Sequence, residues 1–150
     1  MGDMAASLLK FEEIEIGKQE VTVCTITEED VNAFGHLSGD LNPLHMDDEF
    51  ASGTPFGRRV VHGMFTAAII STTHTKLTGP GFVYVGQELN FKGPVYIADT
   101  ITVTLTVTGK KTEKGILLLE TVVTNQNKQV VLQGKSALME LERVGRNRHE

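Results

Sequence analysis

The sequence predicts an α+β domain in which an antiparallel sheet of about five strands wraps around one long central helix. Two observations carry this prediction. From residue 61 to about residue 77 the apolar positions cover most of a helix circumference, which is typical of a helix buried in a core. After residue 81 the apolar period changes to two, which indicates strands. Consecutive strands with short connections pair antiparallel, so one sheet around one helix accounts for both patterns.

One strand and one short helix precede the central helix. Residues 21–26 are apolar and β-branched, as strands commonly are, and include Cys24, the single cysteine of the chain. Cys24 is expected to be a buried structural thiol, and one cysteine excludes an intramolecular disulfide and a cysteine-based zinc cluster. Thr27 is followed by three acidic residues, the pattern of a capped helix start. This helix should end near Gly35.

The remaining strands follow Gly79-Pro80-Gly81, which should stop the central helix. They are expected at residues 82–91, 100–108, 116–124 and 130–141, with turns at 109–115 and 125–128. In the second of these strands, aliphatic residues alternate strictly with threonines. The sheet should therefore have one apolar face toward the helix and one threonine face toward solvent.

Length and composition fit a single domain over residues 1–150, with a core at about 10–141 and loose ends. The chain is 40% hydrophobic and 22% charged, and it is long enough to bury a sizeable core. A net charge of -5 argues against nucleic acid as a partner. No apolar run reaches the ~18 residues of a membrane span, and the first residues lack a signal-peptide pattern. We expect a soluble intracellular protein, cytoplasmic or in an organelle, with no membrane partner.

The segment of residues 39–45, Gly-Asp-Leu-Asn-Pro-Leu-His, is the most informative motif. It places the carboxylate of Asp40 and the imidazole of His45 five residues apart. Pro43 disfavours a helical backbone at Asn42, so the segment should be extended or turned. An acid and a base presented on one loop can move a proton to or from a bound water.

A second motif, Val60-Val61-His62-Gly63-Met64, opens the central helix. The N–H of Gly63 should lie in the first turn, where amide groups lack intrahelical partners and attract negative charge. The sequence therefore proposes an acid, a base and an oxyanion site within 24 residues.

These residues resemble the MaoC-like, (R)-specific enoyl-CoA hydratases. The resemblance rests on the run from Phe34 to His45, on residues 61–64 and on the run from Tyr84 to Phe91, and it covers about residues 10–141. Its signature, Gly-Asp-x-Asn-Pro-x-His, is specific. The resemblance implies the hot-dog fold, a sheet curled around one long helix.

The resemblance also implies a reaction. Asp40 and His45 match the catalytic pair, and the Gly63 amide matches the group that binds the thioester oxygen. The implied lyase reaction is the reversible syn addition of water to a trans-2-enoyl-CoA, which gives an (R)-3-hydroxyacyl-CoA. No cofactor is implied, because coenzyme A is part of the substrate. The sequence leaves open whether coenzyme A or acyl carrier protein is the carrier, and which of the two catalytic residues is the base.

Several residues around these motifs are candidates for substrate binding. They are Asn42, Arg58, Arg59, Val61, His62, Met64 and Ser71. Ser71 lies about two turns beyond Gly63 on nearly the same helix face, which in the resembled family lines the acyl pocket. The arginine pair directly before the helix could meet the phosphates of coenzyme A.

Structural roles compete with these functional ones. Asp40 could be a turn residue, Asn42 could fix the turn, Ser71 could cap a helix carbonyl, and both arginines could be solvated. His62 could be a second catalytic imidazole or a helix-start residue that lines or packs beneath the site.

Other histidines and acids take no part in the predicted site. His36 and His74 look like ordinary surface or pocket histidines. The carboxylates of residues 40, 47 and 48 and the imidazole of His45 have no dedicated ligand spacing, so no metal is expected.

Two other functions and one assembly remain open. A hot-dog thioesterase needs an acid near an oxyanion hole but not this Asp–His segment. A non-catalytic acyl-CoA-binding module is disfavoured by the intact set of Asp40, His45 and Gly63. Because a small sheet leaves open edges, which proteins usually pair or cover, we expect two copies to join edge to edge as a homodimer or a higher homo-oligomer.

Overall fold

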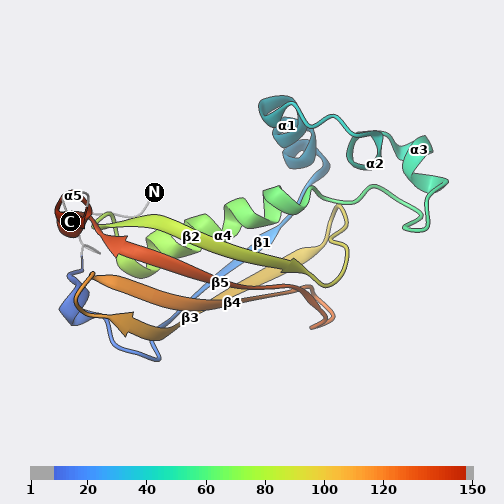
Figure 1. The fold of residues 1–150 in the computed structure, drawn as a ribbon. Coiled ribbons are helices and arrows are strands. Elements are labelled where there is room, and N and C mark those ends of the chain that lie inside the picture. Colours follow the sequence, from blue (N-terminus) through green and yellow to red (C-terminus); the bar gives the residue numbers. More distant parts are fainter. Residues whose placement is uncertain (1–8, 148–150) are drawn as a thin grey trace.

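The structure, a computed structural model, describes residues 9–147 (Figure 1). Its elements in chain order are η2 (Phe11–Glu13), β1 (Gln19–Thr25), α1 (Glu28–Ser38), α2 (Pro43–Met46), α3 (Asp48–Ser52), α4 (Gly63–Thr78), β2 (Phe82–Phe91), β3 (Thr100–Lys111), β4 (Ile116–Thr124), β5 (Val130–Glu140) and α5 (Leu141–Asn147). The short helix α5 occupies positions that the sequence suggests as a loose end. No helix among the described residues combines the length and apolar character that a bilayer crossing requires.

The five strands form one antiparallel sheet in the order β1-β3-β4-β5-β2. The predicted α+β architecture is confirmed, and β2 and β4 begin and end at the predicted residues. Strands β3, β4 and β5 are joined by short turns, whereas the chain between β1 and β2 carries all four helices α1–α4. β1, which precedes these helices, and β2, which follows them, are the two edges of the sheet.

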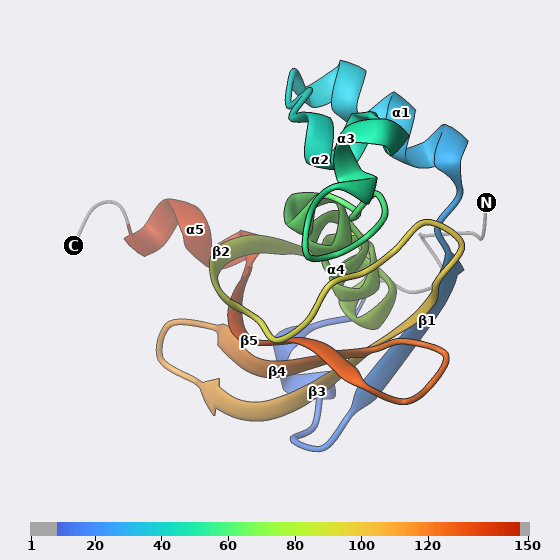
Figure 2. The same cartoon turned by 90° about the vertical axis from the view of Figure 1, so that its right-hand side faces the viewer.

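The core lies between the sheet and α4, around which the sheet curls (Figure 2). Ile101, Val103, Leu105 and Val107 of β3 are fully buried on the helix side. The alternating threonines of β3 lie on the other face and are half-buried or exposed. The two-residue period of this strand thus sets which face of the sheet meets α4.

Helix α4 is covered on one face only, which differs from the all-round burial that its apolar pattern predicts. Ile70 and Leu77 are buried against the sheet, while Met64 is 62% exposed and Ser71 is exposed on the other side. A sheet of five strands encloses only part of the helix circumference (Figure 2).

Helices α1–α3 form a helical lobe, residues 28–52, that stands beyond the first turn of α4 (Figure 1). Thr27 caps α1 as predicted: its hydroxyl accepts from the Asp30 N–H and the Asp30 carboxylate accepts from the Thr27 N–H, both at 3.1 Å. The helix continues past Gly35 to Ser38. Gly35 is buried beneath Met46, whose sulfur would lie 2.5 Å from an added Cβ. This glycine serves close packing and does not end the helix.

Candidate active site

The segment that carries Asp40 and His45 is a turn followed by one helical turn. The backbone of Asn42 is non-helical (φ -51°, ψ 124°), as expected before proline, and its side chain accepts the Leu44 N–H at 3.0 Å. Pro43 then occupies the first position of α2, where a missing N–H is tolerated. The expectation of a non-helical segment is therefore wrong for His45, and Asn42 acts as a helix cap outside the pocket.

The imidazole of His45 has a fixed tautomer. Its Nδ1 lies 2.6 Å from the carbonyl oxygen of Val60, and because a carbonyl can only accept, Nδ1 carries the proton. The other ring nitrogen, Nε2, then carries the lone pair when the ring is neutral. The Val60 N–H donates to the Leu44 carbonyl at 3.2 Å, so the chain before α4 runs beside α2 and holds this acceptor in place.

Arg59 fixes the same helical turn from behind. Its side chain is only 3% exposed, and its Nε donates to the His45 carbonyl at 2.5 Å. Its two terminal nitrogens donate to Glu28 Oε1 at 3.0 Å and to Asn32 Oδ1 at 2.5 Å. Arg59 is not solvated, and its guanidinium bonds to α1 and α2 and lies outside the pocket. Arg59 instead ties the backbone of His45 to helix α1.

Asp40 follows Gly39, which ends α1 in the left-handed conformation (φ 81°) that glycine adopts readily. The Asp40 side chain is exposed, and its Oδ1 accepts the Asn42 N–H at 3.3 Å. Its backbone carbonyl accepts from Nε2 of His62 at 2.9 Å. Ligand atoms of Asp40, His45 and His62 all lie within 4.8 Å of one another.

His62 is the residue directly before α4, and it holds the Asp40 turn. It is 1% exposed, stacks on the His45 ring with centroids 4.1 Å apart, and contacts the Phe34 ring with centroids 4.9 Å apart. Because its Nε2 donates to a carbonyl, its Nδ1 is unprotonated in the neutral ring, and this nitrogen has no partner among the described residues. The geometry gives His62 a positioning role at the wall of the site, one of the two roles that the sequence allowed.

The three side chains are also a possible metal-ligand set, since each imidazole has one nitrogen free of a carbonyl partner. The expectation that no metal is needed stays a prediction, and turnover in the presence of a chelator tests it.

Helix α4 begins at Gly63, two residues after the predicted start at residue 61. The Gly63 N–H belongs to the first turn, as the sequence predicts, and faces no helical acceptor. A Cβ at this position would lie 2.7 Å from Cε1 and 2.8 Å from Cζ of Phe91. The Phe91 ring therefore occupies the space in front of Gly63. The glycine allows this ring to lie against the helix start.

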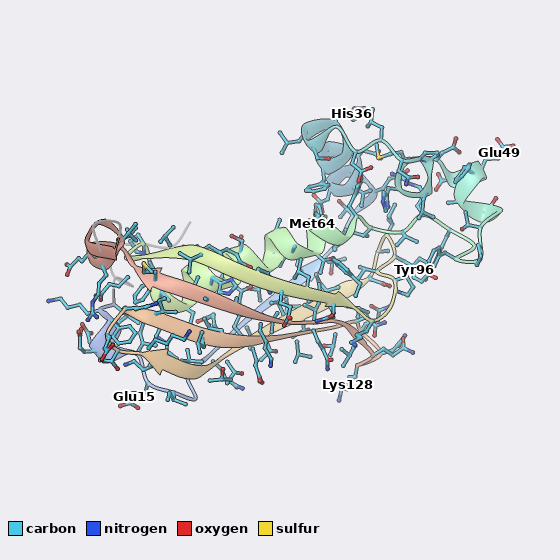
Figure 3. All side chains as sticks on the ribbon, viewed as in Figure 1. Glu15, His36, Glu49, Met64, Tyr96 and Lys128 are labelled. Carbon is cyan, nitrogen blue, oxygen red and sulfur yellow. The ribbon has the colours of Figure 1, made fainter. Side chains whose placement is uncertain are left out.

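One pocket of about 710 Å³ brings the candidate residues together. It is lined by Asp40, His45, Phe56, Val60, Val61, His62, Gly63, Met64, Thr66, Phe91, Lys92, Gly93, Pro94, Val95, Val131 and Leu132. Asp40 and His45 come from the helical lobe and its connections, and the strands and loops supply mainly apolar walls together with Lys92. Figure 3 shows Met64 and Tyr96 at this end of the molecule. Such a volume and such a lining are typical of a small-molecule site.

Four of the candidate substrate-binding residues do not line this pocket: Asn42 and Arg59, described above, and also Ser71 and Arg58. Ser71 is exposed on the uncovered face of α4, so in the protomer it does not line the pocket. Arg58 lines a smaller neighbouring cavity. Conversely, sequence reasoning missed the walls from Phe91, Val95 and Leu132, because the fold alone brings those strands and loops to the helix start.

His74 and Cys24 lie away from the pocket, and burial shifts the pKa of each. His74 is 3% exposed, and burial lowers its pKa to about 4, so the expectation of a surface or pocket histidine is wrong. Its Nδ1 donates to the Ile70 carbonyl at 2.9 Å, and its Nε2 accepts from the Ser136 hydroxyl at 2.7 Å. Cys24 is half-buried, whereas a buried thiol was expected. Burial raises the pKa of its thiol, which fits a structural thiol and not a nucleophile.

The profile of the MaoC-like domain family matches residues 13–131. The chain belongs to this family. The MaoC-like chain is 43% identical over 130 residues to an (R)-specific enoyl-CoA hydratase of Rhodospirillum rubrum, covering 86% of this chain and 90% of that relative. It is 45% identical over 101 residues to a 3-hydroxybutyryl-CoA dehydratase of Methylorubrum extorquens, covering 67% of this chain and 64% of that relative.

A solved structure shares the fold of this MaoC-like protein. It is an (R)-hydratase from A. caviae involved in PHA biosynthesis, with a TM-score of 0.83 and 35% sequence identity. The match covers 86% of this chain and 98% of that one. The hot-dog fold that the resemblance implied is thereby confirmed.

Proposed function

We propose that this MaoC-like protein is an (R)-specific 2-enoyl-CoA hydratase, a hydro-lyase that also dehydrates 3-hydroxyacyl thioesters in the reverse direction. One observation carries the proposal: Asp40, the His45 imidazole and the first amide of α4 meet in a single pocket. The hydratase and dehydratase relatives support it. A reaction of this class belongs to fatty acid metabolism.

The geometry suits a water molecule held by two acceptors. The Asp40 carboxylate is an acceptor when ionised, and the lone pair on His45 Nε2 is a second acceptor close by. One of them takes a proton as the water oxygen bonds to C3 of the enoyl group, and the same proton is returned to C2. The enzyme thus ends in its starting protonation state, and the product contains all the atoms of water.

The attack moves negative charge onto the thioester oxygen. The N–H of Gly63, at the positive end of a 16-residue helix, is the proposed donor to this oxygen. One such donor is typically worth about 3 kcal/mol in the transition state. The fixed tautomer of His45 and the bond from His62 to the Asp40 backbone keep both acceptors on one side of this point.

We further propose that the active form is a homodimer or a higher homo-oligomer joined at sheet edges. The edge strands β1 and β2 each expose valines, with Val23 63% and Val85 49% exposed. Open edges of this kind are usually paired or covered. Light scattering at micromolar concentration should give a multiple of the 16.4 kDa chain mass, and a monomeric mass contradicts the proposal.

Hydration of crotonyl-CoA tests the proposed reaction. Loss of the enoyl absorbance should accompany formation of 3-hydroxybutyryl-CoA, and chiral analysis should give the (R) isomer. Mainly (S) product contradicts the assignment. Release of free coenzyme A thiol and crotonate supports the thioesterase alternative, and tight binding without turnover supports the non-catalytic module.

A further inference from the structure

Thr66 carries a buried hydroxyl for which the protein itself offers no partner. The residue lies on α4, is only 2% exposed and lines the active-site pocket. Its hydroxyl makes no hydrogen bond to any described residue. Buried polar groups nearly always have a hydrogen-bond partner, because an unpaired one loses its hydration without compensation. An unpaired hydroxyl in the wall of a pocket therefore points to a partner that enters the pocket.

The other buried threonines of α4 are satisfied within the helix. Thr73 and Thr78 each bond through the hydroxyl to the carbonyl oxygen four residues earlier, at 2.8 and 3.2 Å. For Thr66 the corresponding acceptor is the His62 carbonyl, which receives the N–H groups of Phe65 and Thr66 and no hydroxyl. Thr66 thus departs from the pattern of its own helix at the point where the helix meets the pocket.

The hydroxyl oxygen of Thr66 can be reached from the pocket. Among the described residues, the side-chain atoms that are both unpaired and completely enclosed are Nδ1 of His62 and the hydroxyl oxygen of Thr121. The Thr66 oxygen is unpaired but does not belong to this group, so it is not completely enclosed. Because the residue lines the pocket, its hydroxyl is available to a molecule bound there.

Thr66 lies close to the proposed donor to the thioester oxygen. It follows Gly63 by three residues, so the two share one face of α4, and both line the pocket. Helical side chains lean toward the N-terminus and cover the preceding turn, which here is the first turn of α4 with Met64 (Figure 3). The ring of Phe91, which lies against Gly63, has no polar atom to pair with either group. One part of the wall therefore holds an amide and a hydroxyl, both able to donate.

We infer that the Thr66 hydroxyl is a second donor to the thioester oxygen, beside the Gly63 N–H. The inference rests on the proposed function and adds a catalytic residue to it. As the water oxygen bonds to C3, negative charge grows on the thioester oxygen, and a hydroxyl hydrogen directed at it stabilises that charge. Thr66 keeps its proton throughout, so the proton still passes from the water to C2 through Asp40 or His45.

Thr66→Val tests the inference, because it replaces the hydroxyl with a methyl group of similar size. Hydration of crotonyl-CoA should show kcat at least ~10-fold lower, with KM within about twofold, since the bond is strongest in the transition state. Thr66→Ser keeps a hydroxyl at the same place and should keep kcat within about threefold of the wild type.

The matched control is Thr73→Val, at a buried threonine of the same helix that lies outside the pocket. It removes the hydroxyl bonds to the Ile69 carbonyl and to Thr22, so the melting temperature should fall while kcat stays near the wild-type value. Thr66→Val breaks no bond within the protein and should leave the melting temperature nearly unchanged. A fall in both kcat and melting temperature in Thr66→Val would show that Thr66 acts through packing, and it overturns the inference.

A ligand that cannot react separates this inference from the proposed function. Butyryl-CoA labelled with ¹³C at the thioester carbon has no double bond to hydrate, and hydrogen bonds to its carbonyl oxygen lower the infrared stretching frequency. In the Thr66→Val complex this band should lie at higher frequency than in the wild-type complex, whereas Thr66→Ser and Thr73→Val should not move it. An unmoved band in Thr66→Val, or an unchanged kcat, overturns the inference. If the band moves but the wild type does not hydrate crotonyl-CoA, the contact from Thr66 stands and the proposed function fails.

Discussion

The sheet with α4 and the helical lobe are held by different forces. In the sheet, whole rows of aliphatic side chains are shut away from water, as in β3. In the helical lobe, the residues beside the reaction are held mainly by hydrogen bonds: a cap from Asn42, a carbonyl bond from His62 and the three bonds of Arg59. This difference implies that stability and activity can be damaged separately.

The largest effect should follow from Asp40→Asn or His45→Gln. Each variant should lower kcat by at least ~10², because an amide can neither take nor return the proton. The free energy of unfolding should change little, since neither side chain belongs to the buried core. The matched control is Asp48→Asn, an exposed acid in the first turn of α3 outside the pocket, which should retain native turnover. Near-native kcat in either active-site variant would remove that residue from the mechanism.

The opposite result is expected in the sheet. Leu105→Ala removes a fully buried side chain from β3 and should lower the free energy of unfolding by about 2–5 kcal/mol. Below the unfolding transition, kcat should stay close to the wild-type value. Urea titration and initial rates on the same preparation measure both. Thr104→Ala, on the other face of the same strand, is the control; a large loss of kcat in folded Leu105→Ala would mean that the two regions are coupled.

A pH effect should come from His74, beneath the sheet and away from the reaction. Burial lowers its folded-state pKa to about 4, while the unfolded chain takes up this proton near 6.5. Between these values the unfolded state binds more protons, so the contribution is fully present above pH 6.5 and is lost as the pH falls toward 4. The loss should reach about 3 kcal/mol at most.

His74→Gln isolates this term. The difference in unfolding free energy between wild type and variant should shrink as the pH falls from 6.5 to 4. A difference that does not depend on pH would show that His74 is not held neutral by the fold.

The smallest effect is expected for two neighbouring arginines, Arg58 and Arg59. Their variants separate positioning of the catalytic residues from binding of the substrate. Arg59→Lys keeps the charge but cannot reach three acceptors at once, so His45 should shift and kcat should fall roughly tenfold with little change in KM. Arg58→Gln should do the reverse, raising KM for crotonyl-CoA at constant kcat. If both substitutions change the same kinetic constant, the distinction between positioning and binding is wrong.

The two-residue spacing of apolar side chains and the turn-forming glycines and prolines were enough to predict the strands of the sheet. The alternation in β3 and the glycine-proline stop after α4 depend only on neighbouring residues, and β2 and β4 were placed at their observed bounds. The expected helix end near Gly35 was wrong. A glycine is needed there because Met46 packs on it from the next helix, a contact that neighbouring residues in the sequence do not indicate.

The parts of the candidate site that lie in two short motifs, residues 39–45 and 60–64, were predictable from the sequence. Asp40, His45 and Gly63 meet as the motif suggested, although His45 lies on a helical turn. The different fates of Arg58 and Arg59 were not predictable, since adjacent side chains separate only when α1 and the Tyr96 loop take their places. The partial cover of α4, and with it the exposure of Ser71, depends on how far the sheet curls.

The central claim is that the helical lobe holds one water on one side of the bound thioester, between Asp40 and His45. Hydration of crotonyl-CoA in D₂O, with the product analysed by NMR, tests it directly. The account predicts one deuterium at C2, on the same face as the new hydroxyl at C3. Deuterium on the opposite face, or on both faces equally, would contradict a single water placed by these two residues.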